Sequence, residues 1–513
     1  MATLSARTRR LALETLADPA EPLDMLVVGG GITGVGVALD AVTRGLRVAL
    51  VEQGDLASGT SRWSSKLVHG GLRYLAKGDI RIARESAVER HHLMTSIAPH
   101  LISPLRQLLP DRGGRRTSVM LLGMRAADVL RRNAGTPSEL LPPPGRLSVI
   151  ETLGRCPMLS TGGLRGGIST TDGQLVDDAR LVVAVARTAA AYGALICTRT
   201  RADRVDGRGA TLTDLRTGES FDVGARMVVN ATGVWSATVD ESIAVSPSRG
   251  THLVVDAARL GNPTAALTVP LGNSLSRYVF ALPAQLGRVY IGLTDVAAPG
   301  PIPDVPAPDD SEVGFLLDAI NPALARPLDR GDVVGVFAGL RPLIHDPTAL
   351  GGDAAEGLAD VSREHHVRVR GDGLVTIVGG KLTTYRRMAQ DAVDAALSTT
   401  DLSASECVTT TTPLVGALRN PREQGLPASL VARFGGEAPS VVEQATVERP
   451  LDPIAPGIDV TRAEVEFAVT HEGALDTDDV VHRRTRIGLV RRDAESARPE
   501  VEKIVERVLH GVG

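Results

Sequence analysis

The chain has 513 residues, which exceeds one ordinary hydrophobic core and predicts two or three domains. Hydrophobic residues make up 43% and charged residues 23%, and the net charge of −4 excludes the cationic excess of a nucleic-acid-binding protein. The three cysteines, Cys156, Cys197 and Cys407, lie far apart, so the sequence excludes a disulfide framework or a CxxC metal pair and favours a reducing compartment without a metal site.

The first 24 residues contain neither a long apolar stretch nor a small-residue cleavage pattern, so we expect no secretion. No apolar run in the sequence reaches the ~20 residues that would span a bilayer. We therefore expect a cytoplasmic protein, and the sequence leaves a peripheral association with the inner face of the cell membrane open.

The strongest local signal follows this segment. Residues 25–28 and 48–51 are typical of two buried strands, and Gly29, Gly31 and Gly34 form G-x-G-x-x-G between the first strand and a helix. In this context the glycines permit a tight turn, close approach of a pyrophosphate and close helix packing. The helix N-terminus offers unpaired N–H groups to the diphosphate. The pattern therefore predicts dinucleotide binding.

Glu52 ends the second strand and can accept hydrogen bonds from the ribose hydroxyls of a dinucleotide. The fingerprint alone leaves NAD and FAD open. Two later strands also end in small-residue turns, at residues 231–233 and 379–380, where a doubly wound sheet places its ligand. Because these elements return so late in the chain, they favour the layout of an FAD protein over a contiguous NAD domain.

Residues 64–75, "SSKLVHGGLRYL", combine small hydroxyls, a lysine, a histidine and Gly70-Gly71 before Arg73. The paired glycines interrupt both helical and strand periodicity. The stretch is therefore either a cofactor wall beside an anionic substrate or an ordinary surface loop. A second Gly-Gly pair directly before Lys381 favours the first interpretation, because glycine lets the backbone approach a ligand closely.

Secondary structure can also be predicted for four further segments. Residues 117–132 form an apolar helix with basic flanks, which is either a core helix or one lying in a membrane interface. Residues 177–193 form a plain helix to which we assign no chemistry, and residues 245–330 alternate like a β-sheet. The arginines between residues 483 and 492 are expected to form a solvated helix face or a subunit contact, which allows a homodimer.

Several segments together identify a family. They are the fingerprint, "DLASGTSRWSSKLVHGGLRYL", "TDGQLVDDARL", "NATGVW", "GTHLVV", "GLTDV", "AGLRPL", "VGGKLTTYR" and the C-terminal "DVVHRRTRIGL". In this order they resemble the FAD-dependent, quinone-linked sn-glycerol-3-phosphate dehydrogenases of aerobic glycerol catabolism, which are membrane-associated. The resemblance is close over residues 24–400. It departs at Arg62 and Trp63, and residues 109–149 match poorly.

The resemblance implies an α/β fold with three parts: a doubly wound, Rossmann-like FAD domain of the D-amino-acid-oxidase type, an antiparallel substrate-binding sheet and a C-terminal helical domain. The expected limits are 22–235 for the first part of the FAD domain, with an insertion near 75–150, then 236–330 for the sheet, 331–400 for the return to the FAD domain and 415–513 for the helical domain.

Site residues follow from the fingerprint, the turns and the resemblance. The expected FAD contacts are Gly29, Gly31, Gly34, Glu52, Thr60, Ser64, Ser65, Gly233, Gly380 and Leu382. The expected substrate contacts are Arg73, Tyr74, Arg363 and Lys381, and the expected catalytic residues are His252 and Arg341. Several cations suit a phosphate dianion. His252 is the general base that the resemblance implies, although its place in an alternating strand alone would favour a structural histidine.

The function expected from this resemblance is oxidation of sn-glycerol 3-phosphate to dihydroxyacetone phosphate, with hydride transfer from C2 to FAD and electrons passing to a quinone. Three alternatives stay open: a glycerol-3-phosphate oxidase that uses oxygen, an amine or amino-acid oxidase, and a flavin-binding module without catalysis. The several cations count against an amino-acid substrate, because one arginine suffices for a carboxylate. His252 and Arg341 together count against a module without catalysis.

Overall fold

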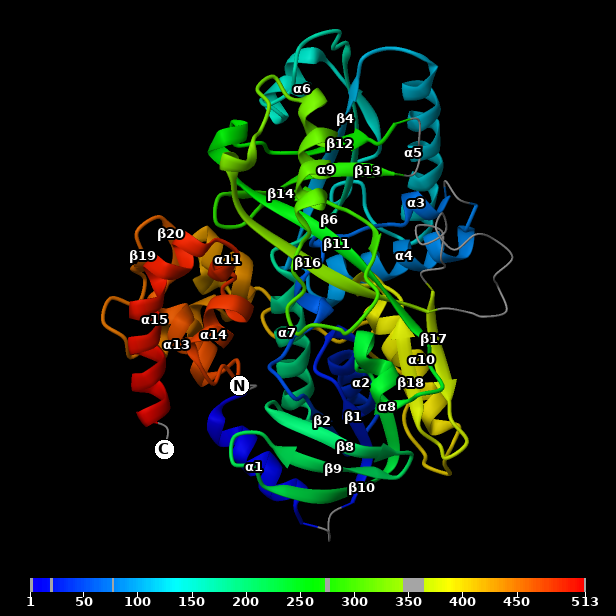
Figure 1. Ribbon diagram of the computed structural model, residues 1–513, viewed down its shortest axis with the longest axis vertical. Helices are drawn as coiled ribbons and strands as arrows, with labels where there is room; N and C mark the ends of the chain where they lie inside the picture. Colours follow the sequence, from blue (N-terminus) through cyan, green and yellow to red (C-terminus); the bar gives the residue numbers. More distant parts are fainter. Residues whose placement is uncertain (1–2, 19–21, 76–77, 273–276, 345–363, 512–513) are drawn as a thin grey trace.

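Two large sheets and a C-terminal helical region make up the fold, seen in a computed structural model of the chain (Figure 1). The structure describes residues 3–18, 22–75, 78–272, 277–344 and 364–511. Within these ranges, the side chains of residues 72, 73, 115 and 116 are outside the description. The predicted α/β class, with a doubly wound sheet, a mainly antiparallel sheet and a helical C-terminal part, is confirmed.

The first sheet is built on five parallel strands. Their order is β18 (Val375–Gly379), β10 (Ser220–Asn230), β1 (Leu23–Val28), β2 (Val48–Val51) and β7 (Leu195–Cys197). Three antiparallel strands extend it: β17 (His365–Val369), β8 (Thr200–Asp206) and β9 (Gly209–Asp214). The central strands are near-continuous hydrophobic runs because both faces of the sheet are covered.

Helices close the two faces of this sheet. On one face α2 (Ile32–Thr43) packs against α7 (Asp178–Ala191) and α10 (Tyr385–Leu397). On the other face lies α1 (Ala6–Leu16), whose apolar side chains join those of β1 and β2. Asp177 caps α7, its side chain accepting a hydrogen bond from the N–H of Arg180.

The strand order of the first sheet indicates where a ligand would bind. The chain passes from β1 to β2 and β7 on one side and then returns to β10 on the other side. The turn after β1 therefore lies where the strand order reverses, and the carboxyl ends of β10 and β18 meet it at the same edge. Ligands of open α/β sheets bind at such a switch point.

The second sheet is mainly antiparallel, with one parallel pair between β12 and β4. Its strands run in the order β15 (Val296–Ala297), β11 (Val245–Asp256), β14 (Arg288–Gly292), β13 (Tyr278–Ala284), β12 (Ala266–Pro270), β4 (Ile102–Asp111), β6 (Gly166–Leu175) and β3 (Leu67–Val68). In addition β16 (Val333–Ile344) pairs with β11, and β5 (Gly145–Leu147) pairs with β6. The sheet thus draws on more of the chain than residues 245–330, while the domain limits stay a prediction.

The C-terminal region, orange to red in Figure 1, stands beside α7. It contains α11 (Ala428–Phe434), α12 (Ala438–Glu443), α13 (Arg462–Thr470), α14 (Thr477–Asp479), α15 (Arg491–Gly511) and a small hairpin of β19 (Pro453–Ala455) and β20 (Ile458–Thr461). A capping box at residues 461–464 begins α13, where Thr461 and Glu464 bond reciprocally.

The apolar segment at residues 117–132 forms α5 (Arg115–Asn133), preceded along the chain by α3 (Leu72–Leu75) and α4 (Ile80–His92). It is a surface helix rather than a core helix. Leu121 and Met124 are buried, whereas Val119 and Leu122 are 56% and 70% exposed. Among the described residues, no helix is long and apolar enough to cross a membrane.

Candidate active site

A cavity of about 1990 Å³ is lined by strands of both sheets and by the C-terminal region. Most of the predicted site residues line it, namely Gly29, Gly31, Glu52, Thr60, Ser64, Ser65, Tyr74, Gly233, His252, Arg341, Gly380, Lys381 and Leu382. Gly34 is buried in the helix α2 (Ile32–Thr43) and does not line the cavity. Arg73 belongs to α3 with its side chain outside the description, and Arg363 lies outside the described residues.

The glycine-rich turn is shaped by close backbone contacts. Gly29 has a φ of +115°, and a Cβ on Gly34 would lie 1.9 Å from the carbonyl oxygen of Gly29. The helix α2 therefore packs directly on the turn, which only glycine at position 34 permits. Ile32, the first residue of α2, donates its N–H to Ser61 Oγ at 2.9 Å. The turn and the helix N-terminus together suit a diphosphate.

Glu52 sits beside this turn at the end of β2. Its carboxylate accepts hydrogen bonds from the N–H groups of Gly30 at 2.6 Å and Gly54 at 2.7 Å. Burial raises the pKa of Glu52, and these two N–H groups oppose the rise. The side chain is thereby fixed in the cavity wall where the fingerprint predicts a ribose contact.

The serine–lysine turn at residues 64–66 is held by a buried carboxylate. Asp178, at the start of α7, accepts hydrogen bonds from the N–H and hydroxyl of Ser64 at 2.8 and 2.7 Å and forms an ion pair with Lys66 Nζ at 2.9 Å. Lys66 has a φ of +58°, which side chains rarely adopt, and it is 2% exposed. The ion pair therefore fixes an unfavourable turn, and the Ser64 hydroxyl is engaged by protein.

His252 lies on β11 in the cavity wall and is 1% exposed. Its Nε2 forms a 2.8 Å hydrogen bond with Ser65 Oγ, and its ring stacks on Phe337 with centroids 4.7 Å apart. Burial, together with the positive charges of Lys66 and Arg341, holds the pKa of His252 well below its usual value. The imidazole is therefore neutral at neutral pH and able to accept a proton.

Arg341 reaches the same wall from β16. Its Nη1 donates to Asp295 Oδ1 at 3.1 Å and to Ser248 Oγ at 3.3 Å, and its Nη2 donates to the carbonyl oxygen of Thr294 at 3.3 Å. A Cβ on Gly250 would lie 2.1 Å from the guanidinium, so glycine there makes room for it. These contacts orient a cation along the cavity near His252.

Lys381 enters the cavity from the turn after β18. Gly379 and Gly380 precede it with φ values of +86° and +73°. Its ammonium lies 3.5 Å from the centroid of the Tyr74 ring and donates to Ser86 Oγ at 3.3 Å. The turn therefore presents a cation over an aromatic face, in the part of the wall where the resemblance implies substrate phosphate.

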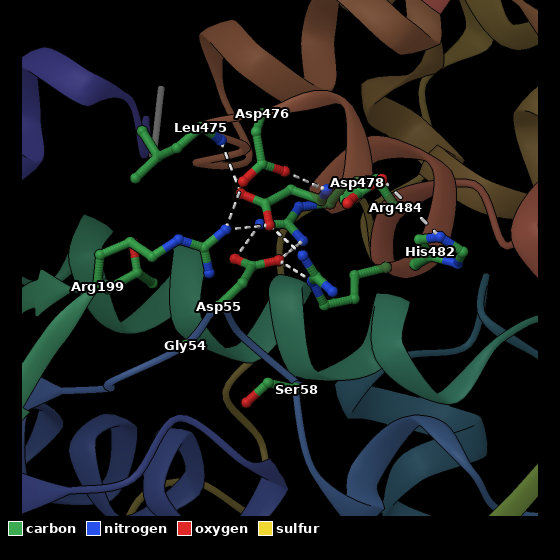
Figure 2. Close-up of polar contacts among 12 residues, drawn as sticks. Gly54, Asp55, Ser58, Arg199, Leu475, Asp476, Asp478, His482 and Arg484 are labelled. Carbon is green, nitrogen blue, oxygen red and sulfur yellow. Dashed lines mark hydrogen bonds and ion pairs between the residues drawn. The ribbon is translucent and has the colours of Figure 1, made fainter. Parts of the chain in front are cut away.

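The C-terminal region closes the cavity through buried ion pairs (Figure 2). Arg484 binds Asp55 with two hydrogen bonds of 2.7 and 2.8 Å, and Arg483 donates to the same carboxylate at 2.6 Å. Burial alone would raise the pKa of Asp55, but these two guanidiniums hold it well below its usual value. Because Asp55 follows Glu52 and Gly54 in the chain, the pairs tie the C-terminal region to the segment that carries the predicted ribose contact.

This arrangement corrects the prediction of a solvated arginine face or subunit contact. The side chains of Arg483, Arg484 and Arg486 are only 11%, 0% and 1% exposed. Arg491 and Arg492, at 91% and 57%, are exposed as expected. A run of charges in one segment does not reveal the buried carboxylates that lie far away in the chain.

Sequence reasoning also missed Lys66 and Asp178. The sequence of the helix that begins with Asp178 is that of a plain helix and indicates no chemistry. One signal was available: "SSK" and "DDARL" both belong to the segments that carry the family resemblance. Similarly, Arg90 and Asp172 line the cavity and form an ion pair, and neither was predicted.

The fold and the cavity define a flavin-dependent oxidoreductase, and comparisons with known proteins agree. Residues 24–386 match the family described as FAD dependent oxidoreductase. Residues 407–510 match the C-terminal domain of alpha-glycerophosphate oxidase. FAD is therefore the cofactor, as the sequence predicts, and the D-amino-acid-oxidase type of fold is confirmed. The glycine turn, Glu52 and the large cavity fit this dinucleotide.

Individual relatives show to which family of FAD-dependent oxidoreductases the chain belongs. The chain is 55% identical over 503 residues to glycerol-3-phosphate dehydrogenase 1 of Mycobacterium tuberculosis, with 96% of each chain covered. It is 35% identical over 548 residues to the mitochondrial glycerol-3-phosphate dehydrogenase of Homo sapiens, covering 98% of this chain and 72% of the human one. The chain belongs to the FAD-dependent glycerol-3-phosphate dehydrogenase family and is an oxidoreductase.

Solved structures agree with this assignment. The crystal structure of the glycerol-3-phosphate dehydrogenase from Bacillus halodurans complexed with FAD matches with a TM-score of 0.71 and 27% identity, covering 99% of this chain and 98% of that one. The L-alpha-glycerophosphate oxidase from Mycoplasma pneumoniae, at 18% identity and a TM-score of 0.56, shares the fold and covers 77% of this chain and 99% of its own.

The buried Lys66–Asp178 pair gives a prediction about stability. Asp178→Asn leaves the Lys66 ammonium buried without a counter-charge, so we expect the free energy of unfolding to fall by about 3–5 kcal/mol. Asp222→Asn is the matched control, because it removes a surface pair with Arg204 and should cost at most about 1 kcal/mol. Urea denaturation measures both. Equal stability of the two variants would contradict the role given to the buried pair.

Proposed function

We propose that the protein oxidises sn-glycerol 3-phosphate at C2 to dihydroxyacetone phosphate. The observation that carries this proposal is the convergence of His252, Arg341 and Lys381, from three separate elements, on the cavity that the dinucleotide turn also lines. The names of the relatives that cover nearly the whole chain support the same substrate.

Each side chain has a defined task in this reaction. The neutral imidazole of His252 accepts the proton of the C2 hydroxyl as the C2–H bond breaks and the carbonyl forms. Bound FAD supplies the acceptor for the hydride that leaves C2. The Arg341 guanidinium steadies the substrate oxygens, and Lys381 attracts the phosphate, with Arg73 and Arg363 proposed as further phosphate contacts from the resemblance.

We also propose which part of FAD each predicted contact residue faces. Gly29, Gly31 and Gly34 shape the diphosphate turn, Glu52 faces the ribose, and the remaining predicted contacts line the cavity wall, namely Thr60, Ser64, Ser65, Gly233, Gly380 and Leu382. Ser65 is the link between cofactor wall and base, because its hydroxyl is bonded to Nε2 of His252.

We further propose a quinone as the electron acceptor, reached at a membrane surface and serving glycerol or glycerophospholipid catabolism. The helix α5 supports this, because it contributes Val119 and Gly123 to the cavity wall and exposes Leu122 outward. Exposed Arg125 and Arg132 flank that apolar surface. The relatives at 55% and 35% identity are named dehydrogenases, whereas the oxidase structure shares only the fold.

The role of His252 is tested by rapid anaerobic mixing. His252→Ala should slow flavin reduction by about 10²–10⁴-fold, because the hydroxyl proton loses its acceptor, while substrate affinity should change much less. His471→Ala is the matched control, since His471 also stacks on a phenylalanine, Phe467, but outside the cavity. A reduction rate within a few-fold of the unsubstituted protein would remove His252 as the base.

The acceptor and the membrane contact are tested together. The protein should co-sediment with vesicles of anionic lipid and dissociate at high salt, because each basic residue near the surface contributes about 1 kcal/mol. Leu122→Glu should weaken sedimentation, whereas Ile150→Glu, on α6 (Val149–Arg155) and 84% exposed, should not. Reduced flavin should be reoxidised faster by a short-chain quinone than by oxygen. Faster reaction with oxygen and no vesicle binding would favour the oxidase alternative.

A further inference from the structure

Arg62 is a buried cation without a counter-charge of its own. It is 4% exposed and lines the cavity. Its Nε has no hydrogen-bond partner, and the guanidinium forms neither a hydrogen bond nor an ion pair with any described residue. It lies over the Trp63 ring, 4.4 Å from the centroid. A guanidinium buried in this way is costly unless an anion accompanies it.

The neighbouring charges are already matched. Lys66 pairs with Asp178 at 2.9 Å, Arg484 with Asp55 at 2.7 Å and Arg486 with Asp177 at 3.2 Å. The carboxylates of Asp55 and Asp178 attract the Arg62 guanidinium electrostatically but form no hydrogen bond with it. Both carboxylates are bound by other donors. Burial and the charges of Arg486 and Arg483 lower the pKa of Arg62 to about 9. Arg62 is therefore the cation left over in this cluster of described residues.

Its position points to one kind of anion. Arg62 ends the short helical turn η1 (Thr60–Arg62), and Ser61 within that turn accepts the N–H of Ile32 at the start of α2. The turn that carries the unmatched cation is thus fastened to the N-terminus of a helix that already favours negative charge. The predicted phosphate contact Lys381 enters the wall from β18, in a different part of the chain.

We propose that the guanidinium of Arg62 binds the diphosphate of FAD. A planar guanidinium can donate to two phosphate oxygens at once, and the turn of α2 supplies backbone N–H groups to the same anion. The family resemblance does not assign this contact, because Arg62 and Trp63 are where the sequence departs from the family pattern. Trp63 carries the guanidinium on its ring and so holds it in the cavity wall.

Flavin binding to the full chain, stripped of cofactor, tests the proposal. Arg62→Met should weaken FAD binding by about 10–100-fold, the usual loss for one charge-assisted contact, and should leave riboflavin, which lacks the diphosphate, within about threefold. Arg62→Lys, which keeps the charge but not the fork, should weaken FAD by about 3–10-fold and fold even where the Met variant does not. Quenching of flavin fluorescence gives both dissociation constants.

Arg187→Met is the control for loss of a buried arginine, since Arg187 pairs with Glu437 at 2.6 Å outside this cavity. It should lower stability without changing the ratio of FAD to riboflavin affinity. Unchanged FAD affinity in both Arg62 variants would overturn the proposal, and so would an equal loss of FAD and riboflavin. A raised KM for sn-glycerol 3-phosphate with intact FAD affinity would assign Arg62 to the substrate instead.

Discussion

The ion pair between Lys66 and Asp178 is the interaction on which the rest of the site depends. It holds Lys66 in a left-handed backbone conformation and fixes Ser64 on the same carboxylate. Ser65, between them, is thereby aimed at Nε2 of His252, and the buried ammonium helps keep that imidazole neutral. Asp178 begins a helix that packs on the first sheet, whereas His252 lies on a strand of the second sheet. One buried charge pair therefore aligns the parts of the site that the two sheets contribute.

Charge burial also explains how the third part of the chain is attached. Asp55 lies just after Glu52, the predicted ribose contact, and is bound by Arg483 and Arg484 of the C-terminal region. A buried ion pair adds little net stability over apolar packing, but removing one partner strongly destabilises the fold, because the other charge stays buried. Such pairs specify one docking arrangement. The cavity wall is consequently built from residues near both ends of the chain, with Asp55 and Arg483 side by side in it.

Local features were predictable from the sequence, whereas the pairing of buried charges was not. The strand–turn–helix around Gly29 follows from hydrophobic runs and glycine spacing, and the cap of α13 follows from four residues. The Lys66–Asp178 contact joins residues 112 apart, and the Arg484–Asp55 contact joins residues 429 apart. No local period encodes such distances, so arginines that form the interior of an interface resemble a solvated face.

We propose that hydride passes from C2 of sn-glycerol 3-phosphate to FAD in this cavity. Anaerobic rapid mixing with the substrate carrying hydrogen or deuterium at C2, with flavin absorbance as the signal, tests this transfer. We expect that the flavin bleaches, that deuterium slows the bleaching several-fold, and that glycerol, which lacks the phosphate, leaves the flavin oxidised. A flavin that stays oxidised with the phosphorylated substrate, or that is reduced equally well by glycerol, would contradict it.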